Sequence, residues 1–106
     1  MSAIAAVKAE TQYATTLTWS TMTTSDTGAA VDTQDLEATK SFHQISGGAA
    51  TAQLQHSNDG TNWVNLGSAL AANSITEVAT SARYIKISTV ASATCSVILS
   101  AKRRRL

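Results

Sequence analysis

Residues 53–67 read Gln-Leu-Gln-His-Ser-Asn-Asp-Gly-Thr-Asn-Trp-Val-Asn-Leu-Gly, and this run predicts a strand, a tight turn and a second strand. Leu54 and His56 alternate with two glutamines, which is the two-residue period of a half-buried strand. The turn at 58–60 supplies residues that tolerate a left-handed backbone. A two-stranded hairpin cannot bury a tryptophan alone, so Trp63 predicts that further strands pack against this one.

The rest of the chain repeats this pattern of short alternating segments separated by polar turns. Further strands are predicted at residues 17–22, 29–33, 40–46, 75–80, 83–89 and 94–101. About seven or eight short strands at regular spacing are typical of an all-β fold. We therefore predict an antiparallel β-sandwich with jelly-roll-like topology.

The predicted core uses one face of each strand. Leu17, Trp19 and Thr21 share a face, and Leu36 is expected to turn inward from a loop. In the last strand the inward positions are Cys95, Val97, Leu99 and Ala101. Cys95 is the single cysteine of the chain, so it is expected to be a small core residue rather than half of an internal disulfide.

The first 16 residues differ from the remainder and predict an extended N-terminal arm, followed by the sandwich domain at 17–106. The arm is rich in alanine, and its large apolar side chains are Ile4, Val7 and Tyr13. Two interpretations stay open: a loosely held terminus, or an arm that crosses to a neighbouring subunit. An arm that crosses to a neighbouring subunit would bury the three apolar side chains against that subunit.

Composition narrows the classes of partner. The chain has 106 residues, a length that fits one domain, and only 14% of them are charged. A net charge of +1 gives no general attraction to nucleic acid or to an anionic membrane, and no apolar run is long enough to cross a bilayer. The N-terminus lacks a basic region followed by an apolar core, so we expect no secretory signal and folding in the cytoplasm.

No arrangement of residues predicts catalysis, a metal ion or a cofactor. His43 and His56 flank Gly47-Gly48, and a simple hairpin there would allow the two imidazoles to approach one another. A metal site would still need further ligands that the sequence does not place nearby. We therefore expect no catalytic residues and interpret both histidines as strand residues with polar neighbours.

Two segments are candidates for binding. The loop residues Asn58, Asp59, Asn62 and Trp63 could hold a sugar, although Asp59 is expected to accept hydrogen bonds from its own turn and Trp63 to anchor the core. The basic run at 102–105 is expected to be a solvated end or a contact for an acidic partner. Four cations are too few for a nucleic-acid-binding domain.

Two motifs in this order carry a family resemblance. The run Ser-Asn-Asp-Gly-Thr-Asn-Trp at 57–63, followed by Ala-Arg-Tyr-Ile-Lys-Ile at 82–87, resembles the core of discoidin-like (galactose-binding-like) jelly-roll domains. It is also similar to small structural proteins of tailed bacteriophages, in which such a hairpin lies in an Ala/Thr/Ser-rich domain with a basic end. The single cysteine and the absence of a signal peptide favour the phage branch.

This resemblance implies a non-enzymatic virion protein. The expected role is a capsid decoration (cement) protein that binds the major capsid protein, bridges its subunits and forms a homo-oligomer, with a trimer preferred. The expected partner-binding residues are Ile4, Val7, Tyr13, Arg103, Arg104 and Arg105. The alternatives are a carbohydrate-binding adhesin module, which would use the loop at 58–63, and a tail or connector component.

Overall fold

The computed structural model describes residues 3–23, 26–46, 52–71, 73–90 and 94–104. Over these ranges the chain forms strands and turns and no helix. The strands are β1 (Ala3–Ile4), β2 (Val7–Glu10), β3 (Ala14–Met22), β4 (Thr27–Asp32), β5 (Leu36–Ser46), β6 (Ala52–Ser57), β7 (Val64–Asn65), β8 (Ser74–Ala79), β9 (Tyr84–Val90) and β10 (Cys95–Arg103).

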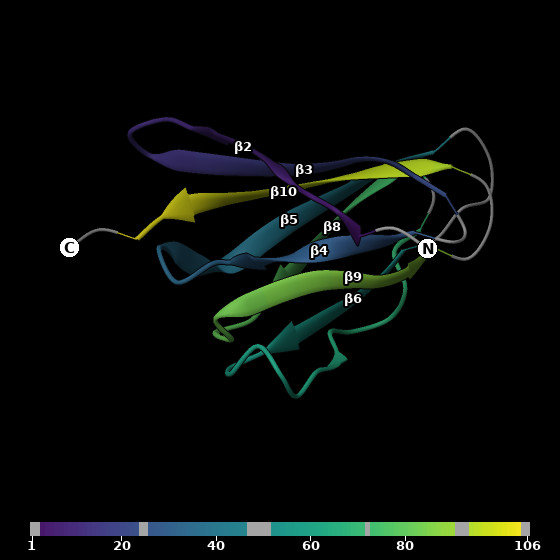
Figure 1. Ribbon diagram of the computed structural model, residues 1–106. Coiled ribbons are helices and arrows are strands. Elements are labelled where there is room, and N and C mark those ends of the chain that lie inside the picture. Colours follow the sequence, from purple (N-terminus) through teal and green to yellow (C-terminus); the bar gives the residue numbers. More distant parts are fainter. Residues whose placement is uncertain (1–2, 24–25, 47–51, 72, 91–93, 105–106) are drawn as a thin grey trace.

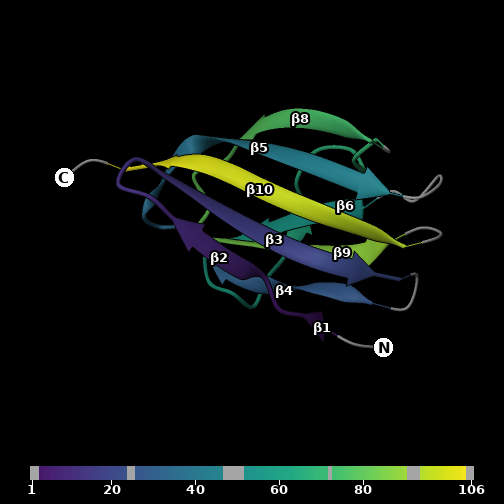
Figure 2. The ribbon, with the colours of Figure 1, turned by 90° about the horizontal axis from the view of Figure 1, so that it is seen from above.

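These strands build two facing layers (Figure 1). Within the described residues, sheet A has five strands in the order β1-β4-β9-β6-β7, and sheet B has five in the order β2-β3-β10-β5-β8. Figure 2 looks onto sheet B, with sheet A behind it. The described pairs are antiparallel except β1 with β4, which is parallel. The predicted antiparallel β-sandwich is confirmed.

Strand β10 occupies the centre of sheet B, between β3 and β5. Its alternation is as predicted, because Cys95, Val97, Leu99 and Ala101 are all buried between the sheets. Trp19 on β3 is also fully buried, and its indole N–H donates to the Ala29 carbonyl oxygen of β4 at 2.9 Å. This bond connects the two sheets through the core.

A β-bulge changes the predicted face of Thr21. The pairing of β3 with β10 shifts register between Val97↔Trp19 and Cys95↔Met22, and Thr21 takes a φ of 56°. Its backbone N–H donates to Ser96 Oγ at 3.0 Å while its side chain is exposed. The extra residue turns Met22 inward, so the prediction that Thr21 faces the core is wrong.

Strands β5 and β6 do not form the expected hairpin around Gly47-Gly48. Strand β5 belongs to sheet B and β6 to sheet A, so the chain crosses between layers, and the two glycines lie outside the described residues. Buried Gln44 spans the layers, because its Oε1 accepts the Ala52 N–H at 2.6 Å. His43 and His56 are consequently in different sheets, so the hairpin that would have allowed their rings to approach is not formed.

The N-terminal segment is integrated into the sandwich. Strand β1 extends sheet A, β2 extends sheet B, and β3 begins at Ala14 rather than Leu17. Ile4 packs against the core, whereas the Val7 side chain is 69% exposed. The extended arm expected for residues 1–16 is therefore corrected over residues 3–16, because backbone pairing of β1 and β2 holds this part against both sheets.

Two buried threonines provide a matched test of polar burial. Thr15 Oγ1 has no hydrogen-bond partner among the described residues, whereas Thr33 Oγ1 donates to the Arg83 carbonyl oxygen at 2.9 Å. We expect Thr15→Val to raise the free energy of unfolding by about 1 kcal/mol, because an unpaired buried hydroxyl is removed at constant shape. Thr33→Val should lower it by about 1 kcal/mol. Urea unfolding measures both, and equal effects of the two changes would contradict the assignment.

Candidate functional site

Four described turns and the end of β10 gather at one end of the sandwich, on the left in Figure 1. We call this the loop end; it consists of residues 11–13, 33–35, 58–63, 80–83 and 103–104. Backbone hydrogen bonds join its parts, from Thr33 N–H to the Arg83 carbonyl oxygen at 2.6 Å and from Arg104 N–H to the Asp35 carbonyl oxygen at 2.7 Å. These bonds hold residues 33–35, 80–83 and 103–104 of the loop end against one another.

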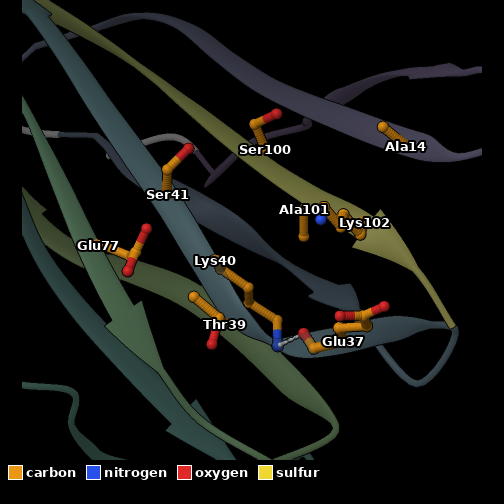
Figure 3. A pocket seen from close by; sticks show the side chains of 9 residues that line it. All are labelled: Ala14, Glu37, Thr39, Lys40, Ser41, Glu77, Ser100, Ala101 and Lys102. Atoms are coloured by element: carbon orange, nitrogen blue, oxygen red, sulfur yellow. Dashed lines mark hydrogen bonds between the residues drawn. The ribbon is translucent and has the colours of Figure 1, made fainter.

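A buried lysine holds part of the loop end together. Lys40 is only 2% exposed, and its Nζ donates to the carbonyl oxygens of Glu37 at 2.8 Å, Ala38 at 3.2 Å and Thr80 at 3.1 Å. Figure 3 shows the first of these bonds. Burial, and to a lesser degree the nearby Arg104 cation, lower the pKa of Lys40. The three carbonyls use all three ammonium donors, so this lysine ties β5 to the residue that follows β8.

An aromatic and basic cluster lies at the loop end, and we call it the end cluster: Tyr13, Lys102, Arg103 and Arg104. These four residues line a hollow of about 770 Å³ together with Gln12, Ala14 and Glu37. The Tyr13 side chain is 63% exposed, and its carbonyl oxygen accepts the Arg103 N–H at 2.8 Å.

Each arginine side chain of the end cluster donates one hydrogen bond to a backbone oxygen. Arg103 Nη1 donates to the Thr11 carbonyl oxygen at 3.2 Å, and Arg104 Nη2 to that of Leu36 at 3.3 Å. Their remaining guanidinium donors are directed to no carboxylate among the described residues.

The structure thus brings together Tyr13, Arg103 and Arg104 of the six predicted partner-binding residues. Ile4 packs on the core at β1, and Val7 lies on the outer face of sheet B. Arg105 lies outside the described residues.

The β6–β7 turn is organised by Asp59, as predicted. Asp59 Oδ1 accepts from Thr61 N–H and Asn62 N–H at 2.8 Å each and from Ser57 Oγ–H at 2.8 Å, while Oδ2 accepts from Asn62 Nδ2 at 2.7 Å. Gly60 completes the turn with a φ of 75°. The hydrogen bonds from Asn62, Thr61 and Ser57 hold the pKa of the Asp59 carboxyl well below its usual range. This carboxylate stabilises the turn, which limits what it can offer a ligand.

Replacing Asp59 with asparagine should make the free energy of unfolding less dependent on pH in the acidic range. Because the folded-state pKa of Asp59 is lowered, its contribution is present above the ordinary value of 3.8 and is lost as the pH falls below it. We expect the urea midpoint of the natural chain to exceed that of Asp59→Asn at pH 6, with the difference shrinking toward pH 2. A difference that is the same at both pH values would contradict this role.

Trp63 is not the core anchor that the sequence predicted. Its side chain is half-buried, and the Lys86 ammonium lies 4.5 Å from its ring centroid on the outer side of sheet A. Leu66 fills the core instead, and its N–H donates to the Leu54 carbonyl oxygen at 2.9 Å. The turn that follows Asp59 leaves Trp63 outside, since β7 is a two-residue edge strand.

The remaining candidate loop residues line a small polar hollow. His56, Asn58, Asp59 and Asn62 border about 280 Å³ of open space, and Trp63 is not among its walls. His56 Nδ1 shares a hydrogen bond of 2.7 Å with Thr80 Oγ1. Within the described ranges, no three His, Cys, Asp or Glu side chains gather in a way that could hold a metal ion. Burial raises the pKa of the Cys95 thiol.

A feature that sequence reasoning missed crosses the outer face of sheet B. Strand register places Val7 beside Thr18, Thr18 beside Ile98, Ile98 beside His43, and His43 beside Ile75. We call these five residues the outer row. The sequence does place β-branched residues at several outward strand positions. The order of the strands, which aligns these residues in one row, cannot be read from alternation alone.

Comparison with known proteins adds information about the fold. No protein-family model and no curated protein matches the chain. Among solved structures, a cupin domain from Bordetella pertussis Tohama I is similar, with a TM-score of 0.52, 10% sequence identity and coverage of 99% of each chain. The shared architecture is the jelly roll, so the predicted jelly-roll-like topology is confirmed. The described part of the chain contains no helix that is long and apolar enough to cross a membrane.

Proposed function

We propose that the chain is a non-enzymatic virion structural protein of a tailed bacteriophage, a capsid decoration (cement) protein that bridges major capsid subunits. The observation that carries the proposal is the end cluster, which lies on turns that backbone hydrogen bonds join to one another. An exposed tyrosine beside two arginines that each donate to a backbone oxygen offers one aromatic contact and several charge-assisted hydrogen bonds.

The rigidity of the loop end supports a role in adhesion. Side chains already held by backbone oxygens lose little conformational freedom when a partner binds, so more of the contact energy appears as affinity. Repetition over a symmetric shell multiplies even a modest contact. The proposed partner surface is acidic, since the end cluster contributes three cations against the single carboxylate of Glu37 in its hollow.

The test is binding to empty heads of the phage whose genome encodes the chain. Purified protein is mixed with heads, and co-sedimentation is measured for the natural chain, for Tyr13→Ala and for Arg103→Glu. The control is Lys86→Glu, which reverses a charge on the outer side of sheet A. We expect both end-cluster variants to weaken binding by about tenfold or more and the control to bind normally. A natural chain that stays in the supernatant, or equal loss in all variants, would contradict the proposal.

The alternative is a carbohydrate-binding adhesin, and the polar hollow beside the β6–β7 turn is the observation that favours it. Two contacts oppose it: Asp59 is occupied by its turn, and Lys86 covers one side of the Trp63 ring.

Tryptophan fluorescence during glycan titration separates the two functions. A saturable shift that Asn58→Ala abolishes would favour the adhesin, because this exposed residue can be truncated without removing the Asp59 bonds. A tail or connector location would instead appear as co-sedimentation with tails.

A further inference from the structure

The outer row crosses all five described strands of sheet B, on the side that faces the viewer in Figure 2. At the two edges, Val7 is 69% and Ile75 is 67% exposed, and Ile45 on β5 adds a further exposed apolar side chain. Thr18 and Ile98 lie between them and are half-buried by their neighbours. Val7, Ile98, Ile75 and Ile45 thus share this face, with Thr18 and His43 between them, and apolar exposure gathered on one face of a small domain points to an interaction surface.

Charge on this face is confined to one side. Glu37, Glu77 and Lys102 surround a hollow of about 360 Å³ floored by small residues such as Ser41 and Ser100 (Figure 3). Along the strands, Ser41 and Ser100 are two residues from His43 and Ile98, away from the Ile45 side. The outer row and the neighbouring positions Ile45 and Ser96 therefore form a half of the face that, among the described residues, carries no Asp, Glu, Lys or Arg.

The size of the face suits a specific protein contact. Five strands at about 4.8 Å spacing give a width of about 24 Å, and a nine-residue strand such as β10 gives a length of about 30 Å. The product, about 700 Å² at most because β2 and β8 are shorter than β10, covers the whole face including the side with Glu37, Glu77 and Lys102. This area is close to the roughly 800 Å² that each partner contributes to a standard interface.

We propose that this face binds a second copy of the chain, with outer row against outer row and the two B sheets packed face to face. The outer row brings no Asp, Glu, Lys or Arg side chain into the middle of such a contact, and Glu37, Glu77 and Lys102 lie to one side of it. A charged partner would have to desolvate its charges against apolar side chains. Stacked sheets approach to about 10 Å, a distance that β-branched and serine side chains fill well. The outer side of sheet A is less suitable, because it presents Lys86, Gln55 and Tyr84.

The proposal assigns the self-association expected from the sequence to the outer face of sheet B. It also replaces the expected threefold symmetry with a twofold one. Contact between the same face of two copies is isologous and closes with two subunits, so it favours a dimer over the trimer expected from the sequence. It does not depend on the virion function, because the end cluster lies at the loop end and not in the outer row.

The test is sedimentation equilibrium of the full chain up to about 100 µM, a range that detects an interface of this class. Ile98→Lys places a charge in the middle of the outer row, and Val64→Lys is the matched control, an exposed strand residue of sheet A. We expect the natural chain and Val64→Lys to dimerise alike, and Ile98→Lys to raise the dissociation constant by about tenfold or more.

Three outcomes would overturn the proposal: a natural chain that remains monomeric throughout, a trimer, or a dimer that Ile98→Lys leaves intact. Circular dichroism establishes that each variant is folded. Should Ile98→Lys fail to fold, Ile75→Lys replaces it, because that side chain is at the edge of the same row and largely exposed. Co-sedimentation of Ile98→Lys with heads separates the dimer proposal from the proposed head binding. A variant that no longer dimerises but still binds heads would show that the outer row serves the dimer and not head binding.

Discussion

Replacing Trp19 with alanine is expected to lower the free energy of unfolding by about 3–5 kcal/mol, the cost of removing a large aromatic side chain from a closed core. Trp19 is 0% exposed and fills the space between β3 and β4. Its truncation also leaves the Ala29 carbonyl oxygen without the indole N–H that it accepts at 2.9 Å. Both losses fall between the two sheets, where neighbouring side chains have little room to collapse inward.

The matched control is the other tryptophan of the chain. Trp63→Ala should cost about 1 kcal/mol or less, because that ring is half-buried and its defined partner is the Lys86 ammonium. Trp19→Phe is the graded variant, which keeps an aromatic ring and removes the N–H. Urea unfolding followed by far-ultraviolet circular dichroism measures all three. A Trp63→Ala cost equal to that of Trp19→Ala would contradict the division of roles.

Replacing Gly28 with valine is expected to destabilise the fold by about 2–3 kcal/mol through overpacking. A Cβ at this position would lie 2.9 Å from Ile87 Cβ and 3.0 Å from Trp19 Cδ1. Neither neighbour is the end of a flexible side chain, since one is the branch point of a fully buried isoleucine and the other an atom of a buried ring. Gly28→Ala should already show a substantial part of this cost.

Ala30→Val on the same strand is the control for this prediction. Ala30 is exposed, so added methyl groups meet no buried neighbour, and β-branched residues suit a strand. We expect its thermal midpoint to stay within a few degrees of the natural chain, while that of Gly28→Val falls clearly. Equal shifts would mean that bulk on β4, and not the close approach of Ile87, sets the cost.

Much of the fold follows from residue alternation. The buried positions of β10 and the place of Trp19 were predictable because a period of two divides each strand into faces. Alternation does not tell which sheet a strand joins, so the crossing between β5 and β6 was missed. Thr21 was missed because a bulge breaks the period, and strands β1 and β2 because alanine carries little strand signal.

The candidate site was predictable only in part. Tyr13 and Arg103 stand 90 residues apart in the sequence and meet because β3 pairs with β10, a register that no local pattern reveals. Ile4 and Val7 are close in sequence and were grouped with Tyr13, yet the chain passes from sheet A to sheet B between them. The role of Asp59 was predictable because an aspartate before glycine serves its own turn.

The central position of β10 has a consequence for synthesis. Sheet B cannot close until residues 95–103 have left the ribosome, because β3 and β5 have no contact with each other without them. Until then the nascent chain exposes two open strand edges and an apolar layer. Before β10 is made, sheet B can pair only as β2 with β3 and as β5 with β8, and the edges that await β10 favour association between nascent chains.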